Sequence, residues 1–566
     1  MVDGTSEIDD PKFFLSPDEK TNAKNELMAT LDALYNESVF DDNATACKFP
    51  ARKAWLSEKL SLKDLPRVAC TNFDNILKRL DPQSVTLVFP SAHINSPASM
   101  FGHTFLRINS AYKSRLLSYA INYAADADPN KENATVFAIK GLFGGYYGEY
   151  SLLPYYEKLK EYRDSENRDI WEYDLDLTKD EVLKMVRHIW ELNGTRSNYY
   201  FFTENCSYNM LWLIEVARPS IHLREYFNFE VIPLETLHAS KQIGIISGSH
   251  YRPSKRSTLL RYEDIIKDNN IHFVRELVNI EVSIKDFQKN SNLSKQQKMY
   301  ILEASIEFLE YTYTKSKITK PQYILQFHKL TKARALLGQG AVVVVETPQN
   351  PITSHRAVRI STGFGYRADN PIGYLGIRPA YHDLEDSSVG FLRGTQIEFL
   401  DMLFSYSKKN KIDVEKITIV SIVSTAQRSE FVSGFSWRMK LGWDKNYLDD
   451  KADFITTLGA GYSIGNKWAY AYGMIDPLFY IADGVTTGIG GSLGLIIDKY
   501  NFMSTNIEAS YRLYHTGFNQ TLINATQSFR MSQNTQLKFQ YEYKDKYYAN
   551  ENFGENSYKV VGNYYF

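Results

Sequence analysis

One cysteine of the chain lies where nucleophilic chemistry is favoured. Cys206 is followed by apolar residues at helical spacing, which share one face of a predicted helix: Met210, Leu213, Ile214 and Ala217. The thiol therefore falls in the first turn of a buried helix, where the positive helix terminus and a neighbouring imidazole would lower its pKa and favour the thiolate. The alternative is a small buried hydrophobic residue at a helix start.

A thiol nucleophile needs a base, and the base needs a group that orients it. The stretch "FGHTFLRI" supplies His103 at the first position of a predicted strand. The next predicted strand, "SYAINYAAD", carries Asn122 among apolar and aromatic neighbours. The arrangement predicts that Cys206, His103 and Asn122 form a catalytic group for acyl transfer through a covalent intermediate.

Several other polar residues are candidates for auxiliary roles. His93 is either a second base, a substrate ligand or a solvated loop residue, and Ser99 either forms a turn or lends its hydroxyl to an oxyanion. Asn205 or Thr203 caps the helix, and Tyr208 lies in its first turn. The expected oxyanion donor is the backbone N–H of the nucleophile or of its neighbour.

The two remaining cysteines are Cys47 and Cys70, about two dozen residues apart. In an oxidising compartment a disulfide between them would stabilise the fold by roughly 3 kcal/mol. The alternative is a pair of buried reduced thiols.

Length and charge limit the classes of function. A chain of 566 residues is too long for one hydrophobic core and predicts roughly two to four domains. Its net charge of -1, from 65 basic and 66 acidic residues, does not favour nucleic acid as a partner. No metal or other cofactor is expected from the residue pattern. The start lacks signal-peptide features, so an exported protein with this sequence would be in its mature form.

The sequence pattern divides the first 345 residues into three parts. Residues 1–83 read as an N-terminal helical cap, and residues 84–249 as a compact α+β domain. Within that domain Thr178 and Glu181 form a predicted capping box. Residues 250–345 are rich in lysine and read as a helical linker domain without site chemistry.

Residues 350–566 change to alternating segments of roughly ten residues, separated by Gly, Asn, Asp and Lys. They predict about twelve antiparallel strands, and the chain is 14% aromatic with 40 tyrosines. Closure of such a series into a transmembrane β-barrel of the outer membrane would remove exposed strand edges. The alternative is a soluble β-sandwich or barrel.

Four motifs in a fixed order carry a family resemblance: "SPASMFGHTFLRI", "KGLFGGYYGEYS", "RDIWEYDLDL" and "FFTENCSYNML". Together they resemble the Lnb N-terminal periplasmic domain family, bacterial proteins implicated in lipoprotein N-acylation. The resemblance covers roughly residues 84–245. The flanking stretches "CKFPARKAWL" and "RPAYHDLEDSSVGFLRGTQIEFLD" resemble segments that accompany this domain in proteins ending in a barrel.

More distantly, the order of the motifs is similar to circularly permuted papain-like enzymes, including NlpC-type peptidases and lecithin:retinol acyltransferase. In this likeness His103 matches the base, Cys206 the nucleophile and Asn122 the third polar residue. The resemblance implies a phospholipid acyl donor, a thioester on the cysteine, and the N-terminal amine of diacylated lipoproteins as acceptor. It further implies a barrel in the outer membrane of a Gram-negative bacterium and a catalytic domain in the periplasm.

Two rival functions remain open from the sequence. One is an NlpC-like cysteine peptidase or amidase acting on peptidoglycan, with water in place of the amine. The other is a non-enzymatic outer-membrane protein that binds lipid or a partner protein, in which changing Cys206 or His103 to alanine would alter stability alone.

Overall fold

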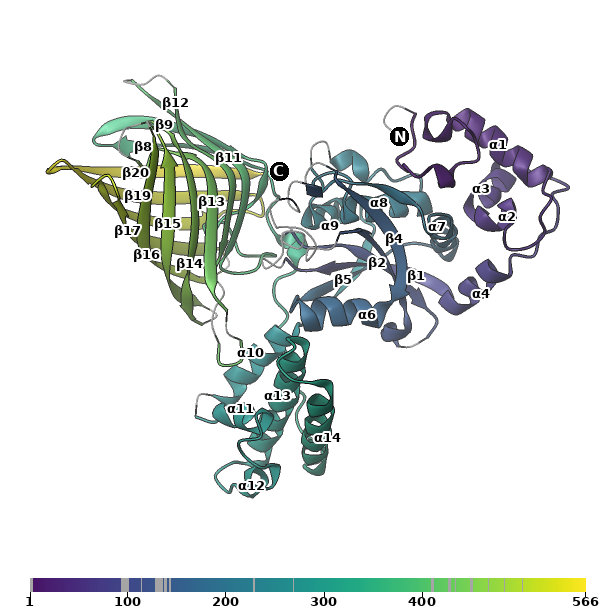
Figure 1. Cartoon of the computed structure of the whole chain (residues 1–566), viewed down its shortest axis with the longest axis horizontal. Coiled ribbons are helices and arrows are strands. Elements are labelled where there is room, and N and C mark those ends of the chain that lie inside the picture. The colour runs from purple at the N-terminus through teal and green to yellow at the C-terminus, as the bar shows by residue number, and fades with distance from the viewer. Residues whose placement is uncertain are drawn as a thin grey trace. The chain divides into compact units, whose positions relative to one another are not determined.

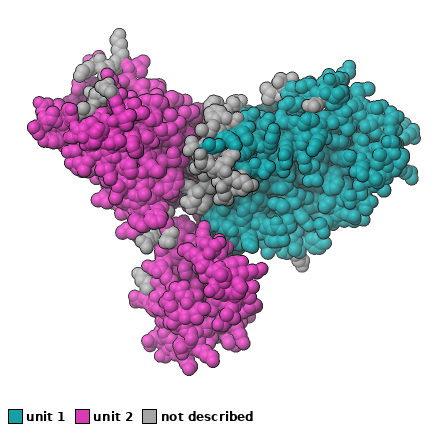
Figure 2. Space-filling model, in the orientation of Figure 1, with its two compact units in different colours: residues 1–255 teal, residues 256–566 magenta. Residues whose placement is uncertain are grey.

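The fold is taken from a computed structural model of the whole chain (Figure 1). It describes residues 4–566 except 93–100, 113, 128–135, 137–139, 142–143, 228–229, 268, 409–411, 426–428, 433, 448–450, 467, 483 and 501. The chain forms two compact units, Met1–Lys255 and Arg256–Phe566, which Figure 2 colours separately. Among the described residues, no helix combines the length and the apolar character needed to cross a membrane.

The first unit is built on an antiparallel sheet with the strand order β6-β4-β3-β2-β1-β5-β7. The strands are β1 (Pro82–Pro90), β2 (Phe105–Ser110), β3 (Tyr119–Ala125), β4 (Tyr146–Pro154), β5 (Ile170–Leu175), β6 (Arg196–Tyr199) and β7 (Ile246–Arg252). Strand β1 pairs with β2 on one side and with β5 on the other. It lies mid-sheet, and six of its nine residues in a row are buried, as expected for a strand covered on both faces.

Helices cover the sheet. In the α+β part they are α6 (Tyr155–Leu159), extended by the π-helical turn η5 (Lys160–Ser165), α7 (Lys179–Glu191), α8 (Cys206–Ala217) and α9 (Pro233–Gln242). The predicted capping box is present at the start of α7, where the Thr178 side chain and the Glu181 side chain each bind the other's backbone N–H. Helix α7 contacts β1, and α8 contacts β2 and β3.

The N-terminal region of this unit is helical, as the sequence predicts. Its helices are α1 (Ala23–Tyr35), α2 (Thr45–Lys48), α3 (Pro50–Leu60) and α4 (Thr71–Leu80). A disulfide joins Cys47 in α2 to Cys70 at the start of α4, with their Cα atoms 5.1 Å apart. The predicted disulfide is therefore confirmed.

A buried carboxylate ties the central strands together. Glu172 on β5 has a fully buried side chain, and its Oε1 lies 2.8 Å from Nη1 of Arg107 on β2. Arg115 and Arg252 also bind it, and Tyr155 donates a 2.5 Å hydrogen bond to it. Burial alone would raise the pKa of Glu172, but the guanidinium groups of Arg107 and Arg252 outweigh it and lower the pKa to about 2.

The second unit begins with a helical region. Its helices are α10 (Lys255–Ile266), α11 (His272–Val278), α12 (Ile284–Lys289), α13 (Lys295–Thr314) and α14 (Lys320–Leu336). They enclose a core of their own, in which Leu277, Ile301 and Leu330 are fully buried. Capping boxes mark the starts of both long helices, formed by Ser294 and Gln297 at α13 and by Thr319 and Gln322 at α14.

The rest of this unit is a closed barrel of twelve antiparallel strands, because β9 pairs with both β8 and β11. The strands are β8 (Arg359–Arg367), β9 (Asn370–Arg378), β11 (Thr395–Ser407), β12 (Asp413–Ser424), β13 (Ser436–Asp444), β14 (Asp453–Gly465), β15 (Ala469–Ile481), β16 (Val485–Tyr500), β17 (Met503–Tyr514), β18 (Asn519–Arg530), β19 (Thr535–Tyr548) and β20 (Glu551–Tyr565). The short strand β10 (Ala380–His382) pairs with β11 as an addition. The predicted barrel is confirmed.

The outer and inner faces of the barrel differ as a membrane requires. Exposed and buried positions alternate along β15 and β16, and the exposed ones are apolar, as at Ile475 (62% exposed) and Leu493 (73% exposed). The inward positions include polar residues, as at Asp476 and Ser492, beside tyrosines and a few apolar residues such as Met474. An apolar exterior around a polar lumen is the pattern of an outer-membrane barrel.

Candidate active site

The candidate nucleophile is the first residue of α8. Cys206 is 4% exposed, and it is the only free cysteine of the chain. Asn205 caps the helix, since its Oδ1 accepts hydrogen bonds from the backbone N–H groups of Ser207 (2.9 Å) and Tyr208 (3.2 Å). The cap is therefore Asn205 and not Thr203, and it fixes the thiol at the end of the helix.

The candidate base is bonded to the predicted orienting residue. Nε2 of His103 lies 2.8 Å from Oδ1 of Asn122. An amide oxygen only accepts, so Nε2 carries the proton in this bond and Nδ1 holds the free lone pair. His103 precedes β2, which begins at Phe105, whereas the sequence predicted it as the first strand residue. Asn122 lies within β3, as predicted.

Two contacts bring the start of α8 to the start of β2. The backbone N–H of Thr104 donates to the Cys206 thiol. The Thr104 hydroxyl also donates a 2.8 Å hydrogen bond to the Ser207 hydroxyl, which is fully buried. Since Thr104 directly follows His103, the fold places the thiol next to the imidazole segment, although the two residues are far apart in sequence.

Burial sets the charge state of both groups. Burial raises the pKa of the Cys206 thiol, and the N–H of Thr104 and the hydroxyl of Ser207 offset only part of the rise. Burial also lowers the pKa of His103 to about 3, against the opposing effect of the Asn122 hydrogen bond. The expected thiolate is therefore wrong for the resting protein: thiol and imidazole are both neutral at pH 7, because the site is desolvated.

The backbone donors that the sequence predicts for an oxyanion are already engaged. The N–H of Cys206 bonds the hydroxyl of Tyr199, whose pKa burial raises well above its usual value, and the N–H of Ser207 bonds Asn205. Tyr199 stacks on Tyr123, with ring centroids 6.0 Å apart and planes 22° apart. The Tyr123 hydroxyl is buried and has no hydrogen-bond partner among the described residues.

These tyrosines are the functional candidates that sequence reasoning missed. Tyr199 reaches the site because β6 pairs with β4, a contact between segments about fifty residues apart, with Tyr146 opposite Tyr199. In a chain with 40 tyrosines, no local signal distinguishes these two from the rest. A third aromatic residue, Tyr162 of η5, packs its ring 5.5 Å from the His103 ring and covers the base.

The auxiliary candidates divide into two groups. Tyr208 is tied to the N-terminal segment, where its hydroxyl donates a 2.9 Å hydrogen bond to Glu7 and Arg224 binds the same carboxylate. It therefore fastens α8 to residues near the chain start. His93 and Ser99 lie outside the described residues.

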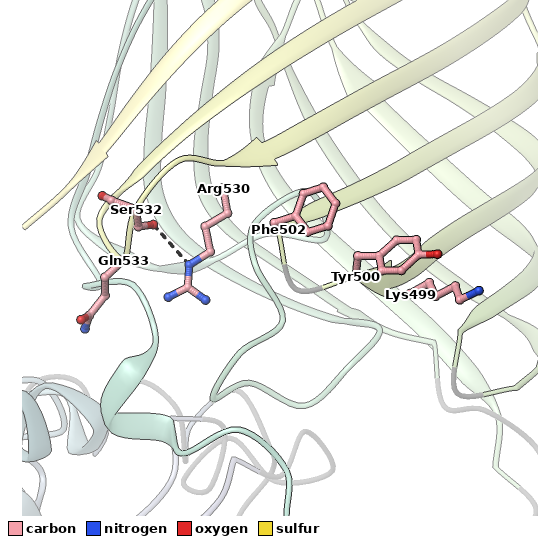
Figure 3. A pocket seen from close by; sticks show the side chains of 6 residues that line it. All are labelled: Lys499, Tyr500, Phe502, Arg530, Ser532 and Gln533. Atoms are coloured by element: carbon pink, nitrogen blue, oxygen red, sulfur yellow. Dashed lines mark hydrogen bonds between the residues drawn. The ribbon is translucent and has the colours of Figure 1, made fainter.

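The barrel rim also has a hollow, of about 610 Å³, lined by Lys499, Tyr500, Phe502, Arg530, Ser532 and Gln533 (Figure 3). The side chains of Lys499 and Arg530 point away from each other, so they do not converge on one ligand (Figure 3). None of the predicted site residues lines it. Within the described part of the chain, no group of three or more His, Cys, Asp or Glu side chains is arranged to hold a metal ion.

A match to a known protein family covers the region of the candidate site. Residues 72–242 match the Lnb N-terminal periplasmic domain. The resemblance predicted from the four motifs is therefore confirmed, and Cys206, His103 and Asn122 all lie within the matched range. Three further matches surround the Lnb N-terminal periplasmic domain, each to a domain of unknown function: DUF7843 over residues 2–59, DUF7842 over 249–344 and DUF7840 over 348–565.

Solved structures with a likeness to the chain are outer-membrane proteins. The NanC porin is 10% identical and covers 37% of this chain and 100% of its own, with a TM-score of 0.26. An outer membrane channel from Pseudomonas putida F1 is 11% identical and covers 40% and 100%, with a TM-score of 0.27. The KdgM porin is 13% identical and covers 37% and 99%, with a TM-score of 0.23. No curated protein matches the chain.

Two findings give the cellular location. The closed barrel has the apolar exterior and polar lumen of an outer-membrane protein. The match of residues 72–242 to the Lnb N-terminal periplasmic domain gives the location of the first unit. The protein lies in the outer membrane with its Lnb-like domain in the periplasm. The likeness to papain-like enzymes stays a prediction.

Proposed function

We propose that the protein is a cysteine-dependent acyltransferase that moves an acyl chain from a phospholipid to the N-terminal amine of diacylated lipoproteins. The observation that carries the proposal is the 2.8 Å bond between His103 Nε2 and Asn122 Oδ1 beside the start of α8. It leaves Nδ1 of the imidazole as the proposed base, one residue before Thr104, whose backbone N–H bonds the buried thiol of Cys206. The Lnb N-terminal periplasmic domain match supports the choice of substrates.

In the first half-reaction the Cys206 sulfur attacks an ester carbonyl carbon of the phospholipid. His103 Nδ1 takes the thiol proton as the sulfur–carbon bond forms, and Asn122 stabilises the resulting imidazolium. The ester C–O bond then breaks, and the imidazolium gives its proton to the departing oxygen. The products are a thioester on Cys206 and a lysophospholipid.

In the second half-reaction the α-amine of a diacylated lipoprotein attacks the thioester carbon. His103 accepts the amine proton, the carbon–sulfur bond breaks, and the proton returns to the sulfur. The products are an N-acylated lipoprotein and the free thiol. Neither half-reaction needs an oxidant, a reductant or a metal ion.

The neutral resting pair suits this cycle. A neutral thiol does not react with water-soluble electrophiles until a base removes its proton, and a neutral imidazole is the form that accepts it. The buried hydroxyls of Tyr199 and Tyr123 are donors for the negative oxygen of each tetrahedral intermediate, because the backbone donors nearby are engaged. Stabilisation of that oxygen in a water-poor site lowers the barrier of both steps.

The test is mass spectrometry of lipoprotein N-termini from cells that depend on this protein for N-acylation. Cells with the wild type should yield triacylated N-termini, whereas Cys206→Ala and His103→Gln should yield diacylated ones. The matched control is His238→Gln, which changes another buried histidine, in α9, that has no role in the proposed reaction. Triacylated lipoproteins in cells with Cys206→Ala would exclude the thioester route.

The same cells distinguish the rival functions. A peptidase would change the fragments of peptidoglycan and leave lipoprotein N-termini as they are. A binding protein without catalysis would leave both unchanged in the Cys206→Ala cells. Purified wild type with a phospholipid labelled in its acyl chain should also carry the label on Cys206 after acid quenching.

A further inference from the structure

The barrel is crossed by its own chain at one end. Between β9 and β11, residues 379–394 leave the wall, add the short strand β10, and return. We call residues 379–394 the plug segment. Its side chains bind residues on strands well away from the two that it connects, so it spans the lumen.

The centre of the plug segment is held by a buried ion cluster. The Asp386 side chain is fully buried, and its carboxylate lies 2.6 Å from Nη2 of Arg378 on β9 and 3.3 Å from Nζ of Lys538 on β19. The Tyr565 hydroxyl at the end of β20 donates a 2.5 Å hydrogen bond to it. One carboxylate of the plug segment thus joins three strands of the wall.

Two neighbouring acidic residues repeat this pattern. Asp383 binds Arg359 on β8 and lies 3.2 Å from Lys538. Glu385 accepts a 2.7 Å hydrogen bond from Thr526 on β18. Further bonds reach Glu385 from residues of β19: Gln536, Lys538 and Gln540. These bonds fix the plug segment to β8, β18 and β19.

The remaining part of the plug segment contacts another stretch of wall. Ser388 bonds the carboxylate of Asp498 on β16, and Arg393 donates a 3.1 Å hydrogen bond to the backbone oxygen of the same residue. Arg393 also lies over the ring of Tyr470 on β15, 5.5 Å from its centroid. Leu384 packs against the apolar cluster that contains Tyr470.

On one side the gap between the plug segment and the barrel wall is small. Where it meets β15, β16 and β17, the cavity has a volume of about 20 Å³. A single water needs at least ~10–15 Å³ of such space, so this gap holds about one water and no hydrated ion. A larger cavity of about 320 Å³ lies in the lumen, with Leu384 and Glu385 of the plug segment among its lining residues.

We infer that the plug segment closes the barrel to ions and solutes, so that the barrel is a sealed membrane anchor and not a channel. The closed end carries both ends of the barrel chain, since the N–H of Phe566 bonds the oxygen of Val358. The chain enters the barrel there from the helical region, so this end faces the periplasm. The inference does not depend on the proposed function of Cys206.

The ion cluster explains why the closure is stable. Moving the plug segment out of the lumen would separate Asp383 and Asp386 from three cations: Arg359, Arg378 and Lys538. Lys538 would lose the three carboxylates that it binds in the plug segment, whereas Arg359 and Arg378 would keep Asp401 and Glu398 on β11. A buried charge that loses its partners is strongly unfavourable, so the ion cluster opposes removal of the plug segment.

The test is ion conductance of the purified full-length protein in planar phospholipid bilayers containing potassium chloride. The wild type should stay at the baseline current. A variant with residues 384–392 replaced by a glycine-serine linker should give discrete open-channel steps. Asp383→Asn combined with Asp386→Asn keeps the segment but weakens its attachment, and should give brief, flickering openings.

The matched control is Asp476→Asn on β15. It also removes a lumen carboxylate, but its partner is Arg438 on β13 and not the plug segment, so the current should stay at baseline. Circular dichroism must show that each variant keeps its strand content. Open-channel steps in the wild type would overturn the inference, and so would a folded linker variant that stays closed. If the linker variant does not fold, the currents of the wild type and of the double variant still test the inference. A folded double variant that stays at the baseline current would then contradict it.

Discussion

At the scale of single residues, the site depends on a thiol and an imidazole that are both uncharged. Cys206 and His103 lose water on burial, and this outweighs the hydrogen bonds that the thiol accepts and the bond that His103 donates to Asn122. In the proposed reaction the proton must therefore move from the thiol to the imidazole as the sulfur attacks. A preformed ion pair of thiolate and imidazolium would give the reactivity of Cys206 a different dependence on pH.

This gives a prediction for alkylation of Cys206 by iodoacetamide. The reaction requires the thiolate, so the rate in the folded protein should stay low between pH 5 and pH 8 and rise only at more alkaline pH. In denaturant, the pH at which the alkylation rate rises should shift down toward the ordinary thiol pKa of about 8.5. The rate is measured by mass spectrometry of the peptide that contains Cys206.

The chain provides its own control for this measurement. Cys47 and Cys70 are joined in a disulfide, so Cys206→Ala should take up no label. A fast, pH-independent reaction of the folded wild type between pH 5 and pH 7 would mean that an ion pair exists, and the neutral resting state would be wrong.

The sequence predicted that Asn122 lies beside His103, but not how Cys206 and His103 are charged. Cys206, His103 and Asn122 could be chosen because a helix start and two consecutive strands supply them. The direction of the cysteine pKa was not predictable, because α8 packs against β2 and β3, which come from a much earlier part of the chain. The hydroxyl of Tyr199 was missed because its position follows from the pairing of β6 with β4.

At the scale of elements, Glu172 links four segments of the first unit. Replacing it with glutamine leaves Arg107 buried without its charge partner, which should lower the free energy of unfolding by about 3–5 kcal/mol. The pKa of Glu172 is depressed to about 2, so the stability that it adds is present above about pH 4.5 and is lost as the pH falls toward 2.

Denaturant titrations of the full-length protein in detergent at several pH values check this prediction. The difference between wild type and Glu172→Gln should shrink between pH 4.5 and pH 2. Glu149→Gln removes an ion pair with Arg196 that is largely exposed, and should cost less than about 1 kcal/mol. Equal effects of the two variants at pH 7 would contradict the role of Glu172.

The individual elements were largely predictable, but their order in space was not. Alternating residues indicated β5, and a capping box indicated the start of α7. The position of β1 between β2 and β5 follows from long-range pairing that leaves no local pattern. The same limit applies to the partners of Glu172, which reads as an ordinary charged residue in a strand.

At the scale of the whole molecule, the barrel exterior should behave as a lipid-facing surface. Leu493 lies near the middle of β16 and is 73% exposed, so Leu493→Lys puts a charge among acyl chains. It should destabilise the folded barrel by about 2–4 kcal/mol in urea titrations in phospholipid vesicles. Leu493→Ala is the matched control and should cost less. A lysine variant as stable as the wild type would contradict a membrane-spanning barrel.

The number of strands was predictable, because each crossing repeats the same alternation. The plug segment was not, since a stretch such as "HDLEDSSVGF" reads as a solvated polar loop. Only a closed wall creates a lumen into which a loop of this kind can fold. Its acidic residues have partners on β8, β9 and β19, which surround the segment only after closure.

The disulfide has a consequence for how an active molecule is made. Three cysteines can pair in three ways, and only one of these leaves Cys206 free. A wrong partner chosen in the unfolded chain would consume the proposed nucleophile, so its survival is decided during oxidative folding. Once the native bond has formed and α8 is buried, the remaining thiol has no partner within its own chain. The Cys47–Cys70 bond thus protects the proposed nucleophile as well as the stability of the fold.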